Sequence, residues 1–391
     1  MKKTSATSFL SKVPAQGMFI FNRGCHGGDI LPYGYKSGII DFSANINPSG
    51  LSKKAAEILK NFKLLKFFTE NYPEIHPESF IQTLSDYHGI DKKYIFPGAG
   101  AADLIFNIVN ILNSNNIIIV EPSFSEYERA AVMRVGKPNI IHINTYFSEN
   151  FELKGKSLSK LLENIKKLDK NDLIFIASPS NPAGAITRIN VVTEILKQVK
   201  TKNAFLVLDE SFMDFCEEFS SKSFIAGGGK FDNLIIIRSM TKFFAMPGQR
   251  LGYIFANPEI ITKFTESSAP WKVTSLSSEI ASASLKDENY ILKSRDLLNK
   301  SKKDFIDKLK KLKSFEIIPG AANFFLIKIK NCGFNAVDLK NYLHKTGILI
   351  RYCGGYLGLD GKYFRIAVRK KSDNDYLIQK LKEFEAEIRY F

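Results

Sequence analysis

Short runs of apolar residues alternate along this chain with segments whose apolar residues recur every three or four positions. The runs are "NNIIIVEP", "DLIFIASP", "AFLVLDE" and "NLIIIRS", and the helical patterns between them lie near residues 101–113, 125–135, 157–168 and 191–201. Strands that alternate with helices in this way predict an α/β fold whose central sheet is mainly parallel. Because ligands bind beyond the carboxyl ends of the strands in such sheets, we expect functional side chains to follow these runs.

After about residue 270 the pattern changes to long lysine-rich helices, followed by further short apolar runs. These runs are "FEIIPGAANFFLIKI", "GILIRYC" and "YFRIAVR", with a helix expected near residues 336–346. The change indicates a second, smaller α+β domain, which fits the length of 391 residues. We therefore expect an N-terminal arm (1–50), a large domain (51–268) and a small C-terminal domain (269–391).

The net charge of +15 lies largely in stretches such as "KGKSLSKLLENIKKLDK" and "KSKKDFIDKLKKLK". Apolar residues recur there every three or four positions, which predicts amphipathic helices with solvated lysine faces. A nucleic-acid-binding protein would show one basic face with interleaved aromatic residues, and the sequence shows none, so nucleic acid is not an expected partner. A positive field would still attract a small anionic substrate.

The sequence also argues against a membrane location and a structural metal. No apolar run reaches 18 residues, so we expect no membrane span. Lys12 and polar residues interrupt the N-terminal stretch, which therefore does not resemble a signal peptide. The four cysteines lie far apart and have no histidine at ligand spacing, which argues against zinc and against a disulfide framework. These features predict a cytoplasmic protein.

A lysine, two hydroxyl residues and two arginines follow the buried run in "NLIIIRSMTKFFAMPGQRLGY". Burial and neighbouring arginines disfavour the ammonium form of Lys242 and make its amine nucleophilic, as a Schiff base with an aldehyde requires. Ser239, Thr241 and Arg250 are donors suited to a phosphate. A strand-end lysine on its own is more often a surface residue, so the interpretation depends on the other motifs.

Two turns supply further candidates. In "PGAGAADLIFNIV" the glycines precede an apolar helix, so free backbone N–H groups could bind a phosphate, although a simple tight turn explains the pattern equally well. The segment is not G-x-G-x-x-G, which disfavours a nicotinamide site. In "ASPSNPAGAITR" the amide of Asn181 could donate to a ligand oxygen, or the segment could be a plain turn.

Asp209 ends the run "AFLVLD", where a carboxylate is costly to bury unless it is paired. Apart from the adjacent Glu210, no second carboxylate or histidine stands at ligand spacing, so a protonated heterocyclic nitrogen is a more economical partner than a metal. A lysine, phosphate-binding donors, an aspartate and an asparagine together predict pyridoxal 5'-phosphate. Asp209 would keep the pyridine nitrogen protonated, which makes the ring an electron sink.

The segments "SPSNPAG", "LDESF", "RSMTKFFAMPGQRLGY" and "FRIAVR" resemble fold-type-I pyridoxal-phosphate enzymes of the class I/II aminotransferase superfamily, in the histidinol-phosphate aminotransferase branch. Within that branch "HGGDI", "DFSANINPSG", "APWKVTSLS" and "GILIRYCGGYLGLDGKYFRIAVR" resemble the L-threonine-O-3-phosphate decarboxylases of cobalamin biosynthesis. The resemblance runs in order over nearly the whole chain. It implies a large cofactor-binding domain with a mainly parallel sheet flanked by helices, and a smaller α+β C-terminal domain.

The resemblance also implies roles for residues around the cofactor. Lys242 forms the Schiff base and Asp209 pairs with the pyridine nitrogen, while Asn181 donates to the ring 3-hydroxyl and Phe124 stacks on the ring. The cofactor phosphate is expected to contact the backbone of Ala101 and Ala102, the side chains of Ser239, Thr241 and Arg250, and Tyr72 from the other subunit. A homodimer with a shared active site is therefore implied.

For the substrate, the resemblance implies a small anionic phospho-amino acid. Arg365 would bind its carboxylate, and the candidates near its phosphate are Arg351, His26, the Gly27 backbone and Asn45. The N-terminal arm would thus contribute to the substrate site. The implied reaction is decarboxylation of L-threonine O-3-phosphate to (R)-1-amino-2-propanol O-phosphate, which is a precursor of the cobamide nucleotide loop.

Departures from the family pattern keep alternatives open. Residues 98–103 lack the usual asparagine and hydroxyl residues of the phosphate-binding segment, and Lys272 and Thr274 stand where the family tends to have serine and asparagine. Phe212 replaces a tyrosine frequent in the aminotransferases, which favours the lyase. The alternatives are a decarboxylase of L-serine O-phosphate, a histidinol-phosphate aminotransferase, and a basic binding protein without catalysis, which the intact set of site residues disfavours.

Overall fold

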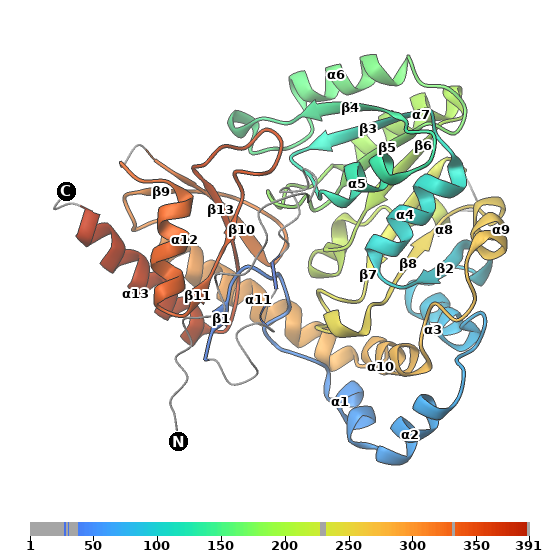
Figure 1. Ribbon diagram of the computed structural model, residues 1–391, viewed down its shortest axis with the longest axis horizontal. Coiled ribbons are helices and arrows are strands. Elements are labelled where there is room, and N and C mark those ends of the chain that lie inside the picture. Colours follow the sequence, from blue (N-terminus) through green and yellow to red (C-terminus); the bar gives the residue numbers. More distant parts are fainter. Residues whose placement is uncertain (1–26, 29, 31–37, 227–231, 331–332, 389–391) are drawn as a thin grey trace, which may run out of the picture.

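The computed structural model describes residues 27–28, 30, 38–226, 232–330 and 333–388. Its main feature is a seven-stranded sheet in the order β2-β8-β7-β6-β5-β3-β4 (Figure 1). The strands are β2 (Ile95–Gly98), β3 (Asn116–Glu121), β4 (Asn139–Asn144), β5 (Leu173–Ala177), β6 (Phe205–Asp209), β7 (Leu234–Ser239) and β8 (Gly252–Phe255). Neighbouring strands pair in parallel from β7 to β4, and β8 pairs antiparallel with both of its neighbours. The mainly parallel sheet is therefore confirmed.

Helices cover both faces of this sheet because alternate side chains of each strand point to opposite faces. Ile117 and Ile119 of β3 pack in the cluster formed with α4, α5 and α9, whereas Ile118 and Val120 pack in the cluster formed with α6 and α7. The helices are α4 (Ala101–Leu112), α5 (Glu126–Met133), α6 (Gly155–Ile165), α7 (Ile189–Lys202), α8 (Ser223–Ala226) and α9 (Pro258–Ser267). The four helices predicted between the apolar runs are thus present, with ends that differ by a few residues.

The C-terminal part contains a four-stranded antiparallel sheet in the order β12-β13-β10-β9. Its strands are β9 (Phe315–Ile318), β10 (Phe324–Ile329), β12 (Arg351–Tyr352) and β13 (Tyr363–Ala367), with α12 (Ala336–Lys345) and α13 (Lys371–Ile388) beside them. α11 (Glu288–Leu309) runs from the region of α10 (Ser275–Leu285) towards this sheet (Figure 1). The smaller α+β unit expected from the sequence is present.

The N-terminal segment joins both parts. β1 (Ile40–Asp41) pairs in parallel with β11 (Ile348–Leu349), and the chain then continues into α1 (Lys53–Lys60), α2 (Phe62–Glu70) and α3 (Glu78–His88). The domain boundaries at 50/51 and 268/269 stay predictions.

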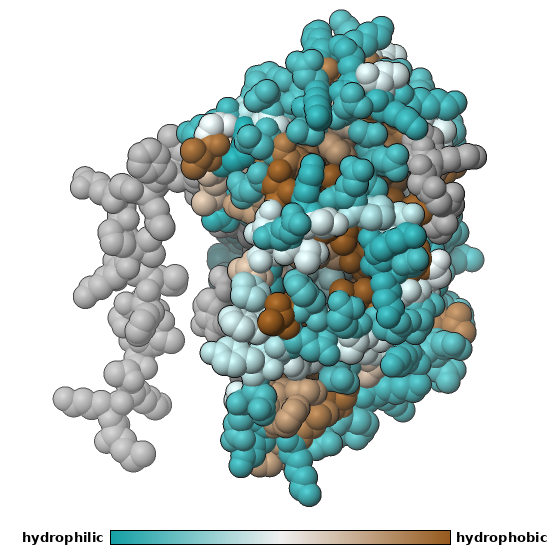
Figure 2. Space-filling view, turned by 90° about the vertical axis from the view of Figure 1, so that its right-hand side faces the viewer, coloured by the Kyte–Doolittle hydropathy of each residue, from teal (hydrophilic) through white to brown (hydrophobic). Residues whose placement is uncertain are grey.

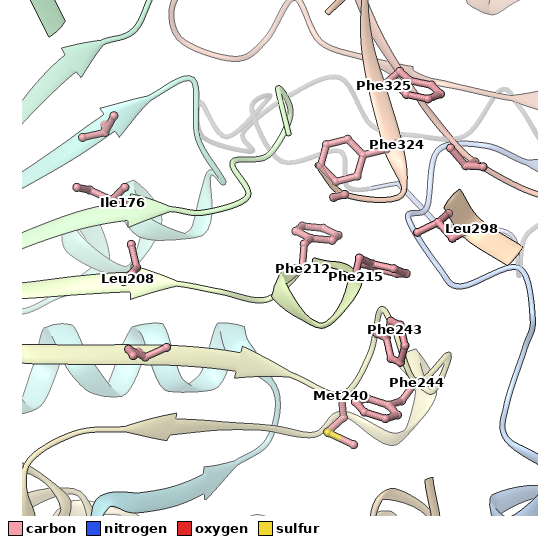
Figure 3. Packing of buried hydrophobic residues seen from close by; sticks show 14 of the residues in the cluster. Ile176, Leu208, Phe212, Phe215, Met240, Phe243, Phe244, Leu298, Phe324 and Phe325 are labelled. Carbon is pink, nitrogen blue, oxygen red and sulfur yellow. The ribbon is translucent and has the colours of Figure 1, made fainter. Parts of the chain in front are cut away.

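Aromatic side chains fill the junction between the large sheet and the C-terminal sheet. Phe212 and Phe215 follow β6, and Figure 3 shows them between the strands of the large sheet and Phe324 of β10. The rings of Phe212 and Phe324 lie 5.0 Å apart, and those of Phe215 and Phe243 lie 5.2 Å apart. The buried residues of both parts thus form one continuous cluster directly behind the ends of β6 and β7.

Hydrophilic residues cover most of the face shown in Figure 2, with small apolar areas between them. In the part of the chain that the structure describes, no helix is both long and apolar enough to cross a membrane.

Candidate active site

A cavity of about 370 Å³ lies at the carboxyl ends of β5, β6 and β7, between the large sheet and the C-terminal sheet. It brings together all the predicted site residues except Tyr72 and His26, namely Gly27, Asn45, Ala101, Ala102, Phe124, Asn181, Asp209, Ser239, Thr241, Lys242, Arg250, Arg351 and Arg365. Tyr72 is 82% exposed and does not line this cavity, and His26 lies outside the described residues. A cavity of this size is typical of a small-molecule site.

The segment after β7 fixes the position of Lys242. The backbone N–H of Asn47 donates to the Lys242 carbonyl at 3.0 Å, and the Asn47 side-chain amide donates to the Phe243 carbonyl at 2.8 Å. Met240 and Phe243 are fully buried on either side. Asn47 thus fixes the backbone from which Lys242 lines the cavity.

The surroundings of Lys242 favour its neutral amine. Burial and the positive charges of Arg365 and Arg250 lower the pKa of Lys242 to about 8, while Asp209 opposes this shift. The ordinary pKa of a lysine is 10.5, so far more of this amine is neutral near pH 8 than in a surface lysine. The electrostatic environment expected from the sequence is therefore present.

Asp209 ends β6 and is held by two donors. The Tyr127 hydroxyl donates to Asp209 Oδ2 at 2.6 Å, and the Ser211 backbone N–H donates to Oδ1 at 2.9 Å. Burial raises the pKa of Asp209, while the hydrogen bonds from Ser211 and Tyr127 and the charge of Lys242 oppose this shift. A cationic group in the cavity would stabilise the carboxylate further.

An ion-pair cluster lies behind this wall of the cavity. Because successive strand residues point to opposite sides, Glu210 and Arg238 face away from the side chains of Asp209 and Ser239. Arg238 is fully buried, and its guanidinium lies 3.1 Å from Glu210, 3.2 Å from Asp214 and 3.0 Å from Glu217. The Arg238–Glu210 pair therefore links the ends of β6 and β7, which carry the two cavity-lining residues.

Hydroxyl groups, an arginine and a helix N-terminus gather at one end of the cavity. The Ser239 and Thr241 hydroxyls lie 2.8 Å apart, and α4 begins next to them after Gly100, which has a φ of 93°. This positive φ favours a glycine, and a Cβ atom at Gly100 would lie only 3.0 Å from Arg250 Nη2, so the turn and the arginine lie close together. The N-terminus of a helix with adjacent cationic and hydroxyl donors is suited to a phosphate.

Arg365 and Asn181 form a pair on the opposite wall. Arg365 Nη1 donates to Asn181 Oδ1, and Nη2 donates to the Ser43 carbonyl at 2.7 Å. Because a guanidinium only donates, the oxygen of Asn181 faces Arg365 and its NH₂ group remains able to donate elsewhere. The donation from Asn181 to a ligand oxygen stays a prediction, for which this orientation leaves the NH₂ group available.

Further polar groups complete the cavity near Arg351. Its guanidinium lies 5.5 Å from the centre of the Tyr356 ring, which limits its orientation. Asn45 is 2% exposed, and its Oδ1 atom has no hydrogen-bond partner among the described residues. A buried polar atom without a protein partner at the wall of a cavity indicates a position where a ligand can bind.

Several cavity residues were not among the sequence candidates, including Tyr127, Glu126, Ser211, Ser43 and Tyr356. Glu126 and Tyr127 lie in "EPSFSEY", two and three residues after Phe124, so the motif itself was the available signal. Ser211 follows Asp209 by two residues, as expected for a donor in a tight turn. Within the described ranges no group of three histidine, cysteine or acidic side chains could hold a metal ion.

Comparison with known proteins identifies the family and the fold of the chain. The model of the family "Aminotransferase class I and II" matches residues 37–381. A threonine-phosphate decarboxylase from Salmonella typhimurium is 30% identical, and the match covers 93% of this chain and 97% of that protein. The histidinol-phosphate aminotransferase structure from Clostridium acetobutylicum has a TM-score of 0.78 at 28% identity and covers 88% of this chain and 99% of that one. The L-threonine-O-3-phosphate decarboxylase structure from Porphyromonas gingivalis shares the fold, with a TM-score of 0.75 at 24% identity over 88% of this chain and 98% of that one. The chain therefore belongs to the aminotransferase class I and II family, whose enzymes depend on pyridoxal 5'-phosphate.

Proposed function

We propose that this enzyme decarboxylates L-threonine O-3-phosphate to CO₂ and (R)-1-amino-2-propanol O-phosphate, as a step of cobamide nucleotide-loop synthesis. The observation that carries the proposal is the presence of two arginines, Arg351 and Arg365, in the cavity that contains Lys242. A phospho-amino acid has two anionic groups, and two separate guanidinium groups can bind them. The extended similarity to the Salmonella decarboxylase supports the same reaction.

We propose one orientation for pyridoxal phosphate in this cavity, because its residues include suitable partners for each polar group of the cofactor. We assign the cofactor phosphate to the start of α4 at Ala101 and Ala102, together with Ser239, Thr241 and Arg250. In this orientation Asp209 would accept a hydrogen bond from the pyridine N–H, and the NH₂ group of Asn181 would donate to the ring hydroxyl. We assign Phe124, which also lines the cavity, to the face of the ring. When bound, the cofactor supplies an electron sink for the electron pair left at the substrate Cα.

Lys242 and Asp209 have separate proton roles in this proposal. The amine of Lys242, with a pKa lowered to about 8, gains and loses a proton readily near neutral pH, so it can deliver a proton to the substrate Cα after CO₂ leaves. In the balanced reaction the bond between Cα and the carboxyl carbon breaks, its electron pair stays at Cα, and one proton replaces the carboxyl group. Asp209 would keep the pyridine nitrogen of the cofactor protonated. Its carboxylate is already oriented for this by hydrogen bonds from Tyr127 and Ser211.

The substrate anchors determine which bond breaks. A bond at Cα ionises only when it stands perpendicular to the ring of the electron sink, so orientation selects the reaction. We assign the substrate phosphate to Arg351, Asn45, the Gly27 backbone and His26, and the carboxylate to Arg365. With the phosphate anchored by these groups, the carboxylate can be turned out of the ring plane.

Two alternatives differ in substrate or reaction. L-serine O-phosphate lacks one methyl group, and an apolar pocket discriminates a methyl by only about 1–3 kcal/mol. The second alternative is transamination of histidinol phosphate, which the similarity to the aminotransferase of Clostridium acetobutylicum supports. Phe212 at the cavity wall favours the lyase over this aminotransferase.

The proposed reaction is tested by incubating the enzyme, loaded with pyridoxal phosphate, separately with L-threonine O-3-phosphate and L-serine O-phosphate, without a 2-oxo acid. We expect CO₂ and aminopropanol phosphate, measured by mass spectrometry, with a rate on the serine compound about 10-fold or more lower. If ethanolamine phosphate formed faster than aminopropanol phosphate, L-serine O-phosphate would be the preferred substrate. Reaction of histidinol phosphate only when 2-oxoglutarate is present, with no amine from either phospho-amino acid, would replace the decarboxylase by the aminotransferase.

We also propose that the enzyme is a homodimer in which Tyr72 binds the cofactor phosphate of the other subunit. Tyr72 is 82% exposed and its ring lies 5.0 Å from that of Trp271, while α2 beside it has no buried residue and exposes Phe62 and Phe67. Exposed apolar residues gathered in this way are typical of a protein interface. Sedimentation should give twice the mass of one chain, and a monomeric mass at micromolar concentration would contradict the proposal.

A cytoplasmic location is part of the same proposal. Cys216 and Cys353 are buried free thiols, which fits a reducing compartment. Fractionation of cells that produce the protein should recover it with cytoplasmic markers, and recovery with secreted proteins would exclude this location.

A further inference from the structure

An acidic side chain lies in the first turn of the helix whose N-terminus faces the proposed phosphate position. Asp103 is the third residue of α4, and its Oδ2 accepts a hydrogen bond from the Ala99 backbone N–H at 3.1 Å. A Cβ atom at position 98 would lie 3.0 Å from this oxygen, so Gly98 leaves room for the carboxylate. Asp103 therefore holds the turn that leads into α4.

The charge of Asp103 conflicts with phosphate binding at the same helix end. A helix N-terminus attracts anions through its free N–H groups and its dipole, and a carboxylate in the first turn uses part of this attraction. A phosphate carries up to two negative charges, so an uncompensated Asp103 would repel it. Arg250, the cation assigned to the phosphate, already donates from Nη1 to the Pro247 carbonyl at 3.1 Å.

Lys272 provides the missing compensation from a distant part of the chain. Its Nζ lies 3.2 Å from Asp103 Oδ1 and 3.5 Å from Oδ2. The two side chains are 19% and 27% exposed, so the pair is partly shielded from solvent. The residues that follow Lys272 are fixed: Val273 is buried, and the Thr274 hydroxyl accepts from the Ser277 backbone N–H to begin α10.

We propose that Lys272 is a positioning residue of the cofactor-phosphate site, which neutralises Asp103 so that this carboxylate can hold the turn at Ala99 without repelling the phosphate. The inference rests on the proposed cofactor orientation, with the phosphate at the start of α4. It assigns Lys272 no direct contact with cofactor or substrate. The effect of replacing Lys272 on cofactor binding is therefore predicted to require both the carboxylate of Asp103 and the phosphate group of the cofactor.

The test compares Lys272→Met, Asp103→Asn and the double variant with the unmodified enzyme. Asparagine keeps an oxygen that accepts from Ala99, and it removes the charge. Lys263→Met is the matched control. Lys263 is an exposed lysine of α9 that forms no ion pair with Asp103, so this substitution removes the same charge without affecting the carboxylate. Dissociation constants for pyridoxal phosphate and for pyridoxal, which lacks the phosphate, are measured by equilibrium dialysis.

We expect Lys272→Met to weaken pyridoxal phosphate binding about 10-fold and to leave pyridoxal binding nearly unchanged. The double variant should return to within about 3-fold of the unmodified enzyme, and Lys263→Met should have no measurable effect. Equal weakening of both ligands by Lys272→Met, or no recovery in the double variant, would overturn the inference in favour of a purely structural ion pair. If the unmodified enzyme binds pyridoxal as tightly as pyridoxal phosphate, the proposed phosphate position itself is wrong.

Discussion

Replacement of Lys242 by alanine is expected to lower the rate of CO₂ release by about 10³-fold or more, because in the proposed mechanism this one side chain supplies both the covalent attachment and the proton for Cα. The variant should remain folded, since the backbone around position 242 is held by Asn47 and by the buried Met240 and Phe243. The rate is measured as CO₂ and phosphorylated amine, and folding as the thermal unfolding midpoint. Retention of activity within about 10-fold of the unmodified enzyme would remove Lys242 from the mechanism.

A second buried lysine provides a control for this assignment. Burial lowers the pKa of Lys302 to about 8, as it does for Lys242. Lys302 donates to the carbonyls of Gly320 and Ala321 at 2.5 and 2.9 Å and does not line the cavity. Borohydride reduction of the enzyme with bound pyridoxal phosphate, followed by peptide mapping, should therefore label Lys242 and leave Lys302 unlabelled. Label on Lys302 would indicate that a lowered pKa alone, rather than position in the site, selects the lysine.

The sequence was most informative where function follows a strand end. Asp209 and Ser239 each stand at the last position of a strand that is buried throughout, so the continuous apolar runs of β6 and β7 and the polar residues that end them were sufficient to predict both as candidates. Lys242 follows three residues after Ser239, and the loop between them is too short to carry it away from the same sheet edge. For these residues the local sequence pattern is enough, because the end of the strand in the sequence is also the edge of the sheet where the site lies.

Interactions between distant segments were not accessible in the same way. Tyr127 lies 82 residues before Asp209, and Lys272 lies 169 residues after Asp103, so no local periodicity relates either pair. Lys272 could be recognised from the sequence only as a departure from the family pattern. Its partner Asp103 depends on the three-dimensional structure, because the packing of α10 against α1 and α3 determines where the segment with Lys272 lies. The mainly parallel sheet was predictable, whereas the antiparallel pairing of β8 was not, because pairing direction depends on the connection through the Lys242 loop.

Replacement of Asp209 by asparagine is expected to lower the decarboxylation rate by about 10³-fold, equivalent to about 4 kcal/mol of transition-state stabilisation. Asparagine has nearly the same shape and can still accept from the Ser211 N–H, so the variant removes the negative charge with little change in packing. Without that charge the pyridine nitrogen is not held protonated, and the ring accepts electrons less well. The affinity for pyridoxal phosphate should change less than the rate, because the proposed phosphate contacts lie at the other end of the cavity.

Tyr127→Phe is the graded partner of this variant, since it removes one hydrogen bond to the carboxylate and leaves its charge in place. A hydrogen bond to a charged group contributes about 1.5–3 kcal/mol, so the rate should fall by about 10-fold to 100-fold, less than for Asp209→Asn. The order of the two effects is decisive, because it separates the charge of Asp209 from its orientation. If Tyr127→Phe were as damaging as Asp209→Asn, orientation alone would explain the role of the aspartate. If Asp209→Asn kept most of the rate, a protonated pyridine nitrogen would not be needed, and the assignment of Asp209 to that end of the ring would be wrong.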